Sequence, residues 1–145
     1  AVQRTEKERA ERMKSQVKIL SNPKTEAQHQ MNVINWSILH TSEWPELALL
    51  HHIPNGGTRD AVEGRHLKQA GVKAGVPDLC LPTAKGKYHG LYLEMKTETG
   101  RPTAEQKWWG EQLVRQGYMW EVCYGWQSAV RALEWYLSLP DEDAL

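Results

Sequence analysis

The chain has 145 residues, 40% of them hydrophobic and 25% charged, and its formal net charge is zero. This length favours one domain around one hydrophobic core, and no apolar run approaches the roughly 20 residues of a membrane-spanning helix, so no membrane partner is expected. The neutral balance gives no global basic field of the kind that nucleic-acid-coating proteins carry, although a local basic face would suffice for an enzyme.

Residues 1–22 are rich in Arg, Lys, Glu and Gln and predict a charged helix or arm outside the core. This segment lacks the apolar stretch of a secretory signal peptide. The two cysteines, Cys80 and Cys123, lie in strand-like runs and are expected to be buried thiols. A cytoplasmic protein is therefore expected.

The main domain is predicted to open with a helix. Thr25 and Gln28 have the spacing of a capping box, in which the two side chains satisfy backbone N–H groups at a helix start. Met31, Ile34 and Ile38 then recur at helical spacing.

The remaining elements follow in the order strand, helix, strand, strand, helix, strand and helix, over residues 47–53, 60–70, 78–81, 90–96, 103–117, 118–124 and 127–137. Asp60 and Thr103 are predicted to begin two of the helices. Together these elements predict a single α/β domain over residues 23–139, with a central sheet covered by helices, and an acidic tail over residues 140–145.

The two adjacent strands over 78–81 and 90–96 separate an apolar from a polar face, because successive strand side chains point to opposite sides. The apolar, core-facing residues are Leu79, Leu81, Leu91, Leu93 and Met95. The opposite face carries Asp78, Glu94 and Lys96. If the two strands pair, two acids and a lysine converge at one place on the polar face, outside the core.

Such a set suits phosphodiester hydrolysis. A hard cation such as Mg²⁺ takes carboxylate oxygens while keeping several waters, and it neutralises charge that develops on the phosphate. A lysine can orient or deprotonate the attacking water, or stabilise the transition state. The same residues are also compatible with a structural ion pair at the surface.

Two further matches to the same patterns lie in less suitable places. Glu105-Gln106-Lys107 repeats the E-x-K spacing inside a helix start, where residues i and i+2 do not share a face. Pro140-Asp141 repeats the Pro-Asp pair in the acidic tail. Only Pro77-Asp78, followed by Glu94-Met95-Lys96, falls on two adjacent strands.

These motifs resemble, in their order along the chain, the virus-type replication-repair nuclease (VRR-Nuc) domain, a branch of the PD-(D/E)xK nuclease superfamily. The resemblance covers roughly residues 25–139 and rests on PNGG at 54–57, GVKAGVPDL at 71–79 and GLYLEMK at 90–96. It continues through Gly100, Gln106 and Gly117-Tyr118 to Gly125-Trp126.

The resemblance implies a restriction-endonuclease-like core with a central mixed β-sheet flanked by helices. It also implies a DNA endonuclease dependent on Mg²⁺ or Mn²⁺, structure-selective for branched DNA such as flaps or Holliday junctions in replication or repair. Stand-alone relatives from bacteria or phage-infected hosts are generally homodimers.

The resemblance further implies roles for individual residues. Asp78, Glu94 and the backbone carbonyl of Met95 would bind the cation, and Lys96 would be the catalytic lysine. Glu26 would be a further acidic residue of the site, acting directly or through a water. Gln106 would lie at the edge of the site.

Contacts with DNA are predicted around the glycine-rich loop. The resemblance places Asn55 and Gly56 near the site, and a basic side follows in the sequence with Arg59, Arg65, Lys68 and Lys73.

Each of these residues also has a purely structural interpretation. Glu26 suits the positive end of a helix dipole, Gln106 completes a capping box with Thr103, and Asn55 with its glycines forms an ordinary turn. Basic residues on a helix are usually a solvated face. The histidines and cysteines lack the spacing of a structural zinc site, so zinc is not expected.

The seven tryptophans stand in a chain without phenylalanine and are mostly expected in the core, with Trp44 as the exposed exception. Base stacking is the alternative role for such residues. Two other functions stay open at this point: a module of the same fold that binds DNA without cleaving it, and a nuclease that acts on RNA.

Overall fold

A computed structural model describes residues 5–55 and 61–141. The described elements, in chain order, are α1 (Glu6–Gln16), α2 (Glu26–Leu39), the 3-10 helix η1 (Pro45–Leu49), β1 (His51–His52), α3 (Ala61–Gln69), β2 (Leu79–Leu81), β3 (Leu91–Lys96), α4 (Ala104–Arg115), β4 (Met119–Tyr124) and α5 (Trp126–Leu137). Asp60, predicted to begin the third helix, lies outside the described residues.

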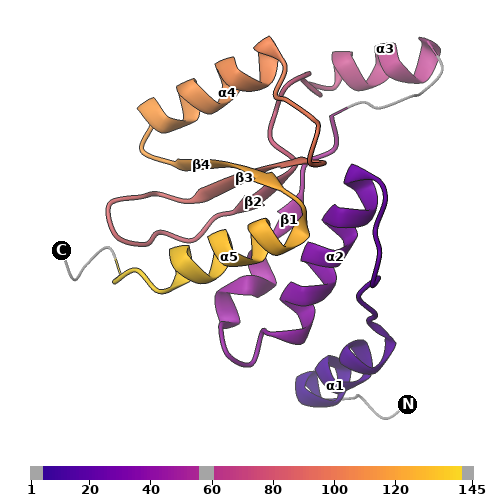
Figure 1. Ribbon diagram of the computed structural model, residues 1–145, viewed down its shortest axis with the longest axis vertical. Helices are drawn as coiled ribbons and strands as arrows, with labels where there is room; N and C mark the ends of the chain where they lie inside the picture. Colours follow the sequence, from indigo (N-terminus) through magenta and orange to yellow (C-terminus); the bar gives the residue numbers. More distant parts are fainter. Residues whose placement is uncertain (1–4, 56–60, 142–145) are drawn as a thin grey trace.

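The four strands form one mixed sheet in the order β1-β2-β3-β4. β2 runs antiparallel to β1 and to β3, and β3 and β4 are parallel. The C-terminal ends of β3 and β4 therefore meet at the same edge of the sheet, and the start of β2 lies there too. Helix α4 lies over one face of the sheet, and α2 and α5 lie over the other (Figure 1).

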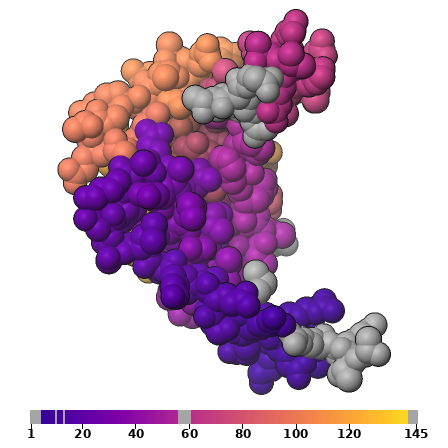
Figure 2. Space-filling view, turned by 90° about the vertical axis from the view of Figure 1, so that its right-hand side faces the viewer, coloured from indigo at the N-terminus to yellow at the C-terminus, as the bar shows by residue number. Residues whose placement is uncertain are grey.

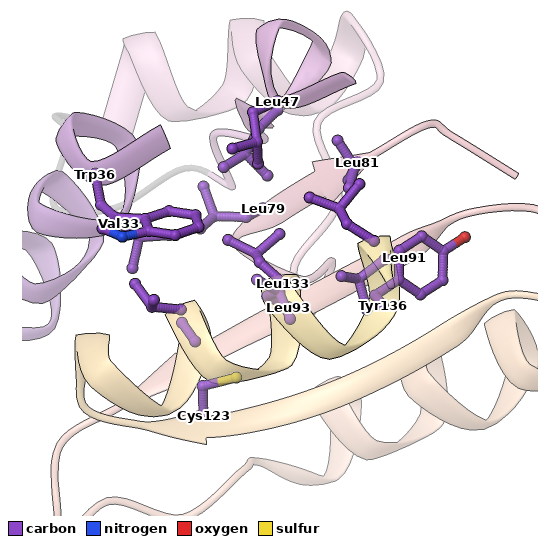
Figure 3. Packing of buried hydrophobic residues seen from close by; sticks show 14 of the residues in the cluster. Val33, Trp36, Leu47, Leu79, Leu81, Leu91, Leu93, Cys123, Leu133 and Tyr136 are labelled. Carbon is purple, nitrogen blue, oxygen red and sulfur yellow. The ribbon is translucent and has the colours of Figure 1, made fainter. Parts of the chain in front are cut away.

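The core lies between the sheet and the pair α2 and α5 (Figure 3). The predicted apolar face of the two central strands is confirmed, because all five of its residues are at most 1% exposed. They pack against Val33 and Trp36 of α2 and against Leu133 and Tyr136 of α5. Burying each such side chain stabilises the fold by roughly 1.5–3 kcal/mol, so this layer holds the site-bearing strands in place.

The prediction of a strand over residues 47–53 is mostly wrong. A 3-10 helix occupies Pro45–Leu49, and only His51–His52 pairs with β2. Pro45 presets the backbone φ angle for a helical turn, and the Leu47 N–H donates to the Trp44 carbonyl at 3.0 Å. The apolar residues of this segment still reach the core, because Leu47 and Leu50 are buried from a turn instead of a strand.

The buried face of α2 only partly matches the predicted spacing of Met31, Ile34 and Ile38, of which Ile34 packs against the core. Met31 is 55% exposed, whereas Asn32, Val33 and Trp36 are buried. The buried Asn32 amide is satisfied by the backbone of Leu20, donating to its carbonyl at 3.0 Å and accepting from its N–H at 2.8 Å. A polar side chain on the inner face of α2 thus anchors the chain segment that precedes the helix.

The charged N-terminal segment forms α1, capped by Thr5 and Glu8 in a capping box. This helix projects from the rest of the molecule (Figure 2). Its described side chains are largely exposed. Within residues 5–55 and 61–141, no helix combines the length and apolarity needed to cross a bilayer.

The tryptophan expected to be exposed is not the exposed one. Trp44 is partly buried and packs against the core beside Trp36, with ring centroids 6.3 Å apart. Trp108 on α4 and Trp135 on α5 are instead 56% and 50% exposed. The cysteine prediction is confirmed, because Cys80 and Cys123 are buried free thiols.

Candidate active site

Asp78 is held at the bend that enters β2. Its Oδ2 accepts the Met95 N–H at 2.7 Å, just beyond the point where the β2–β3 ladder ends. Its backbone carbonyl accepts from the Ile53 N–H at 2.8 Å and from His52 Nδ1 at 2.8 Å. Asp78 is therefore fixed from β1 and β3 together, and its carboxylate faces the β3 residues that carry the other site groups.

Glu94 lies on β3, on the face opposite the core leucines, and is 1% exposed. Its Oε1 accepts from Gln106 Nε2 at 3.0 Å, while its buried Oε2 has no hydrogen-bond donor among the described residues. Burial, and next the neighbouring Asp78 carboxylate, raise the pKa of Glu94 to about 8 from its ordinary value of 4.5. Glu26 adds to this rise in pKa and Lys96 opposes it, so all three groups lie within electrostatic reach.

Lys96 ends β3 and meets the start of α2. Its Nζ lies 3.8 Å from Glu26 Oε1, and the two side chains are 8% and 48% exposed. Glu26 is placed there because the capping box of Thr25 and Gln28 sets the first turn of α2. Gly100 packs over the lysine stem, where a Cβ atom at position 100 would lie 3.3 Å from Lys96 Cδ.

Gln106 makes two contacts, one in the cap of α4 and one with Glu94. Its Oε1 accepts the Thr103 N–H at 2.8 Å, completing the capping box of α4, while Nε2 donates to Glu94. Using both ends of the amide fixes its orientation. The Gln106 side chain thus completes the cap of α4 and also ties this helix to the Glu94 carboxylate.

The polar face of β3 is not open to solvent as predicted. Glu94 is 1% and Lys96 7% exposed, because Gln106 on α4 and the turn around Gly100 cover them. Alternation along the strand sets the side to which a residue points, but it does not show that a helix lies over that side. The site is a buried polar layer between the sheet and α4, open toward Asp78 and Glu26, both of which are partly or largely exposed.

The donor set fits a hard divalent cation. Such an ion would bind two adjacent carboxylates, one of which has a buried oxygen with no hydrogen-bond partner in the described part of the chain. In residues 5–55 and 61–141, no three His, Cys, Asp or Glu side chains gather to enclose an ion. Mg²⁺ and Mn²⁺ tolerate so few protein ligands because water completes their coordination, and the nearby Met95 backbone is the remaining candidate predicted from sequence.

The predicted DNA-contact residues are only partly described. Asn55 donates from Nδ2 to the Val76 carbonyl at 3.4 Å, which ties the loop after β1 to the chain entering β2. Arg65 and Lys68 are exposed on α3, which buries none of its residues, and Lys73 is exposed beside α4. Gly56 and Arg59 lie outside the described residues.

His52 is a site-supporting residue that the sequence did not single out. From the sequence, the histidines are candidates only as zinc ligands. In the fold, the His52 ring donates to the carbonyl of Asp78. No local motif marks this contact, because the two residues are 26 positions apart. Only the pairing of β1 with β2 brings them together.

A mixed four-stranded sheet flanked by helices, with two acids and a lysine at one edge of its central strands, is a restriction-endonuclease-like fold. The chain belongs to the VRR-NUC domain family, which matches residues 10–127, and this is a nuclease family. A solved structure named as a VRR_NUC domain protein is 33% identical and superposes with a TM-score of 0.71, over 86% of this chain and 97% of that one. A comparison with the curated proteins gives no match. The family and the fold expected from the motifs are both confirmed.

Proposed function

We propose that this protein is a DNA endonuclease. Its active site, formed by Asp78, Glu94 and Lys96 with a bound Mg²⁺ or Mn²⁺, would hydrolyse phosphodiester bonds of the DNA. The observation that carries this proposal is the buried Glu94 Oε2, which has no hydrogen-bond donor within residues 5–55 and 61–141 and lies beside a second carboxylate. A buried carboxylate oxygen without a hydrogen-bond partner is costly to the fold, and a divalent cation bound there would offset that cost.

Each residue would contribute a separate part of the reaction. Asp78 and Glu94 would hold the cation, which supplies neutralisation of charge on the phosphate when bound. The Lys96 ammonium, almost excluded from water, would orient the attacking water or stabilise the negative charge of the transition state. Glu26 keeps the Lys96 ammonium paired at 3.8 Å, and Gln106 fixes the Glu94 carboxylate at 3.0 Å.

The substrate that we propose is branched DNA of the flap or four-way-junction kind, cut by a homodimer. One chain carries one such site, and one site cuts one strand. Symmetric cleavage of a junction needs two cuts on strands related by a two-fold axis, which a C2 pair of identical chains supplies. Arg65 and Lys68 on α3, with Lys73, would hold backbone phosphates near the site.

Cleavage of a DNA panel with near-isosteric site variants tests this proposal. Asp78→Asn, Glu94→Gln and Lys96→Met should each lower cleavage by about a hundredfold or more. These changes avoid leaving a cavity or a new unpaired charge in the buried layer. The matched controls are Asp141→Asn in the second Pro-Asp pair and Glu121→Gln on the neighbouring strand β4, both exposed and both expected to cut like the wild type.

The panel should contain linear, flap, nicked and four-way DNA and the corresponding RNA, each with Mg²⁺, Mn²⁺ or EDTA. Wild-type cleavage that survives EDTA, or Lys96→Met activity within a few-fold of wild type, contradicts the mechanism. Faster cutting of RNA than of every DNA identifies an RNA nuclease instead. No cutting of any substrate, with DNA still bound, identifies a non-cleaving module.

Calorimetry tests the cation separately from catalysis. Mn²⁺ should bind the wild type and not the Asp78→Asn/Glu94→Gln double variant, because both carboxylates are needed to hold a hard ion. Unchanged affinity in the double variant would place the ion elsewhere.

A further inference from the structure

A second depression lies outside the site, between α4 and the chain that enters β2. It has a volume of about 610 Å³, within the range of clefts that hold small ligands. Its walls are mainly apolar and are formed by Lys73, Ala74, Ala104, Glu105, Trp108 and Trp109. We call it the tryptophan groove.

The walls of the tryptophan groove are fixed to each other. Trp109 Nε1 donates to the Ala74 carbonyl at 3.1 Å, which ties α4 to the chain before β2. Gly75 then passes so close to the helix that a Cβ there would lie 2.8 Å from the Glu105 backbone carbon. Gly75 also has a φ of 89°, a conformation that other residues rarely adopt. The groove is therefore preformed.

Trp108 presents a large aromatic surface along this groove. It is 56% exposed, more than any other residue of its size among the large exposed apolar side chains of the described chain. Its ring meets that of Trp109 edge-on, with centroids 5.8 Å apart and planes at 89°. Because Trp109 is held by its hydrogen bond, Trp108 is braced from one side while much of its surface remains in water. An exposed tryptophan in a preformed apolar groove is typical of a binding surface.

Both walls of the groove lead directly to the proposed active site. On α4, Glu105 precedes Gln106, whose amide holds Glu94. On the other wall, Lys73 lies five positions before Asp78 in the same chain segment. A group bound in the groove would thus contact the two segments that position the site carboxylates.

We propose that the tryptophan groove binds an unpaired nucleobase of the DNA substrate, stacked on Trp108. This inference rests on the proposed function and adds one feature to its substrate class: a base beside the cut that is unpaired, or that the protein extrudes from the duplex. A base in a continuous duplex has both faces covered by its neighbours, so only an unpaired or extruded base has a free face for the indole.

The charges along the groove favour one orientation of a bound nucleotide. Lys73 supplies a cation for a phosphate, whereas the Glu105 carboxylate would repel one. The sugar-phosphate backbone would therefore follow the Lys73 side, and Glu105 would face the base, where it can accept from an amino group. Cytosine, adenine and guanine carry such a group and thymine does not.

Equilibrium binding in EDTA tests the groove without the cleavage reaction. The two probes are duplexes of equal length, one fully paired and one with a single unpaired 2-aminopurine whose fluorescence reports stacking. Wild-type protein should prefer the unpaired probe. Trp108→Ala should weaken binding of this probe about tenfold, the scale of one base stacked on an aromatic side chain, and barely change the paired probe. Trp108→Phe should retain most of the preference.

Trp135→Ala is the matched control, since Trp135 is 50% exposed on α5 and lies outside the groove. It should keep the wild-type preference. Lys73→Ala should weaken the binding of both probes to the same extent. It should also lower the salt dependence of the affinity by the equivalent of about one released counterion.

The inference is overturned if Trp108→Ala keeps the wild-type preference, or if Trp135→Ala loses it equally. It is also overturned if Trp108→Ala turns a dimer into a monomer by light scattering, which would make the groove an interface between copies. Failure of the proposed function is a separate result: the preference and its dependence on Trp108 would stand, while no DNA would be cut with Mg²⁺ or Mn²⁺.

Discussion

At the scale of single residues, the polar groups of the site also hold the fold together. The Asp78 carboxylate accepts a hydrogen bond from the Met95 N–H. Gln106 caps α4 and also donates a hydrogen bond to Glu94. Only one oxygen of the Glu94 carboxylate is used in this way. Buried networks are stable when every member is satisfied, so the other oxygen, Oε2, lowers the stability of the polar layer unless another group binds it.

The first prediction concerns the pH dependence of the metal-free protein. The unfolded chain ionises Glu94 above its ordinary pKa of 4.5, whereas the fold raises that pKa to about 8. Between these values the unfolded state binds fewer protons, so folding stability falls as the pH rises. In EDTA, the melting temperature of the wild type should therefore fall relative to that of Glu94→Gln from about pH 5 to pH 8.

Mn²⁺ should reverse this difference near pH 8, because the cation binds the ionised carboxylate and displaces the proton. The comparison with Glu94→Gln cancels the histidines that titrate in the same window. Parallel melting curves for the two proteins in EDTA would mean that Glu94 is not held protonated by the fold.

At the scale of elements, two helices deliver their first turns to the site. α2 and α4 both begin with a complete capping box, and their first turns carry Glu26 and Gln106. An N-terminal cap sets both the stability of a helix and the position at which its first side chains begin. The caps should therefore influence activity as well as stability.

The second prediction compares two capping boxes that each begin with a threonine. Thr25→Ala removes the α2 cap, and it should lower the free energy of unfolding by ~1 kcal/mol and slow cleavage, because Glu26 loses its fixed place beside Lys96. Thr5→Ala removes the same kind of cap from the projecting α1 and should leave the melting temperature and the activity nearly unchanged. Equal effects of the two variants on activity would show that α2 capping does not position Glu26.

The third prediction concerns how closely α4 lies on the sheet. A Cβ at Gly110 would lie 2.2 Å from the Trp120 ring of β4, whereas nothing lies within 4 Å of a Cβ at Gly64 on α3. Gly64→Ala should be neutral or stabilising by up to ~1 kcal/mol, from helix propensity alone. Gly110→Ala should lower the melting temperature despite the same propensity gain, and it should slow cleavage by shifting Gln106 away from Glu94. A Gly110→Ala protein as stable and active as wild type would mean that α4 can shift without disturbing the site.

At the scale of the whole molecule, the mixed sheet gathers the site from distant parts of the chain. The parallel pairing of β3 and β4 puts Lys96 opposite Tyr124, at the edge where α5 begins. The antiparallel pairing of β2 brings Asp78 to the same edge, and the helices on both faces complete the layer. The described residues of the candidate site therefore all come from one chain.

The fourth prediction is that two such sites work together. Light scattering at micromolar concentration should show a dimer, and a plasmid that extrudes a cruciform should be linearised in a single encounter, because the two-fold axis matches that of the junction. The Lys96→Met protein should show the same dimer without cutting. A monomer that yields only nicked circles would contradict the prediction that two sites work together. One chain would then act alone and cut one strand at a time.

The local features of this protein could be predicted from its amino-acid sequence. Alternation along residues 90–96 predicted the apolar and polar sides of β3, and the capping boxes at Thr25 and Thr103 predicted the starts of α2 and α4. The ordered motifs around Asp78 and Glu94 predicted the family. These features depend on residues a few positions apart, which is why their spacing is visible in the chain.

The surroundings of those features depend on how distant segments of the chain pack together. It buried Glu94 and Lys96 beneath α4 and the Gly100 turn, joined His52 to Asp78, and turned α2 so that Asn32 faces inward. Each of these outcomes depends on contacts between segments brought together by the packing of the sheet and helices, and no local spacing encodes such contacts. A strand pattern sets the direction of a side chain, but its solvation, and with it the pKa of Glu94, depends on the element that packs above it.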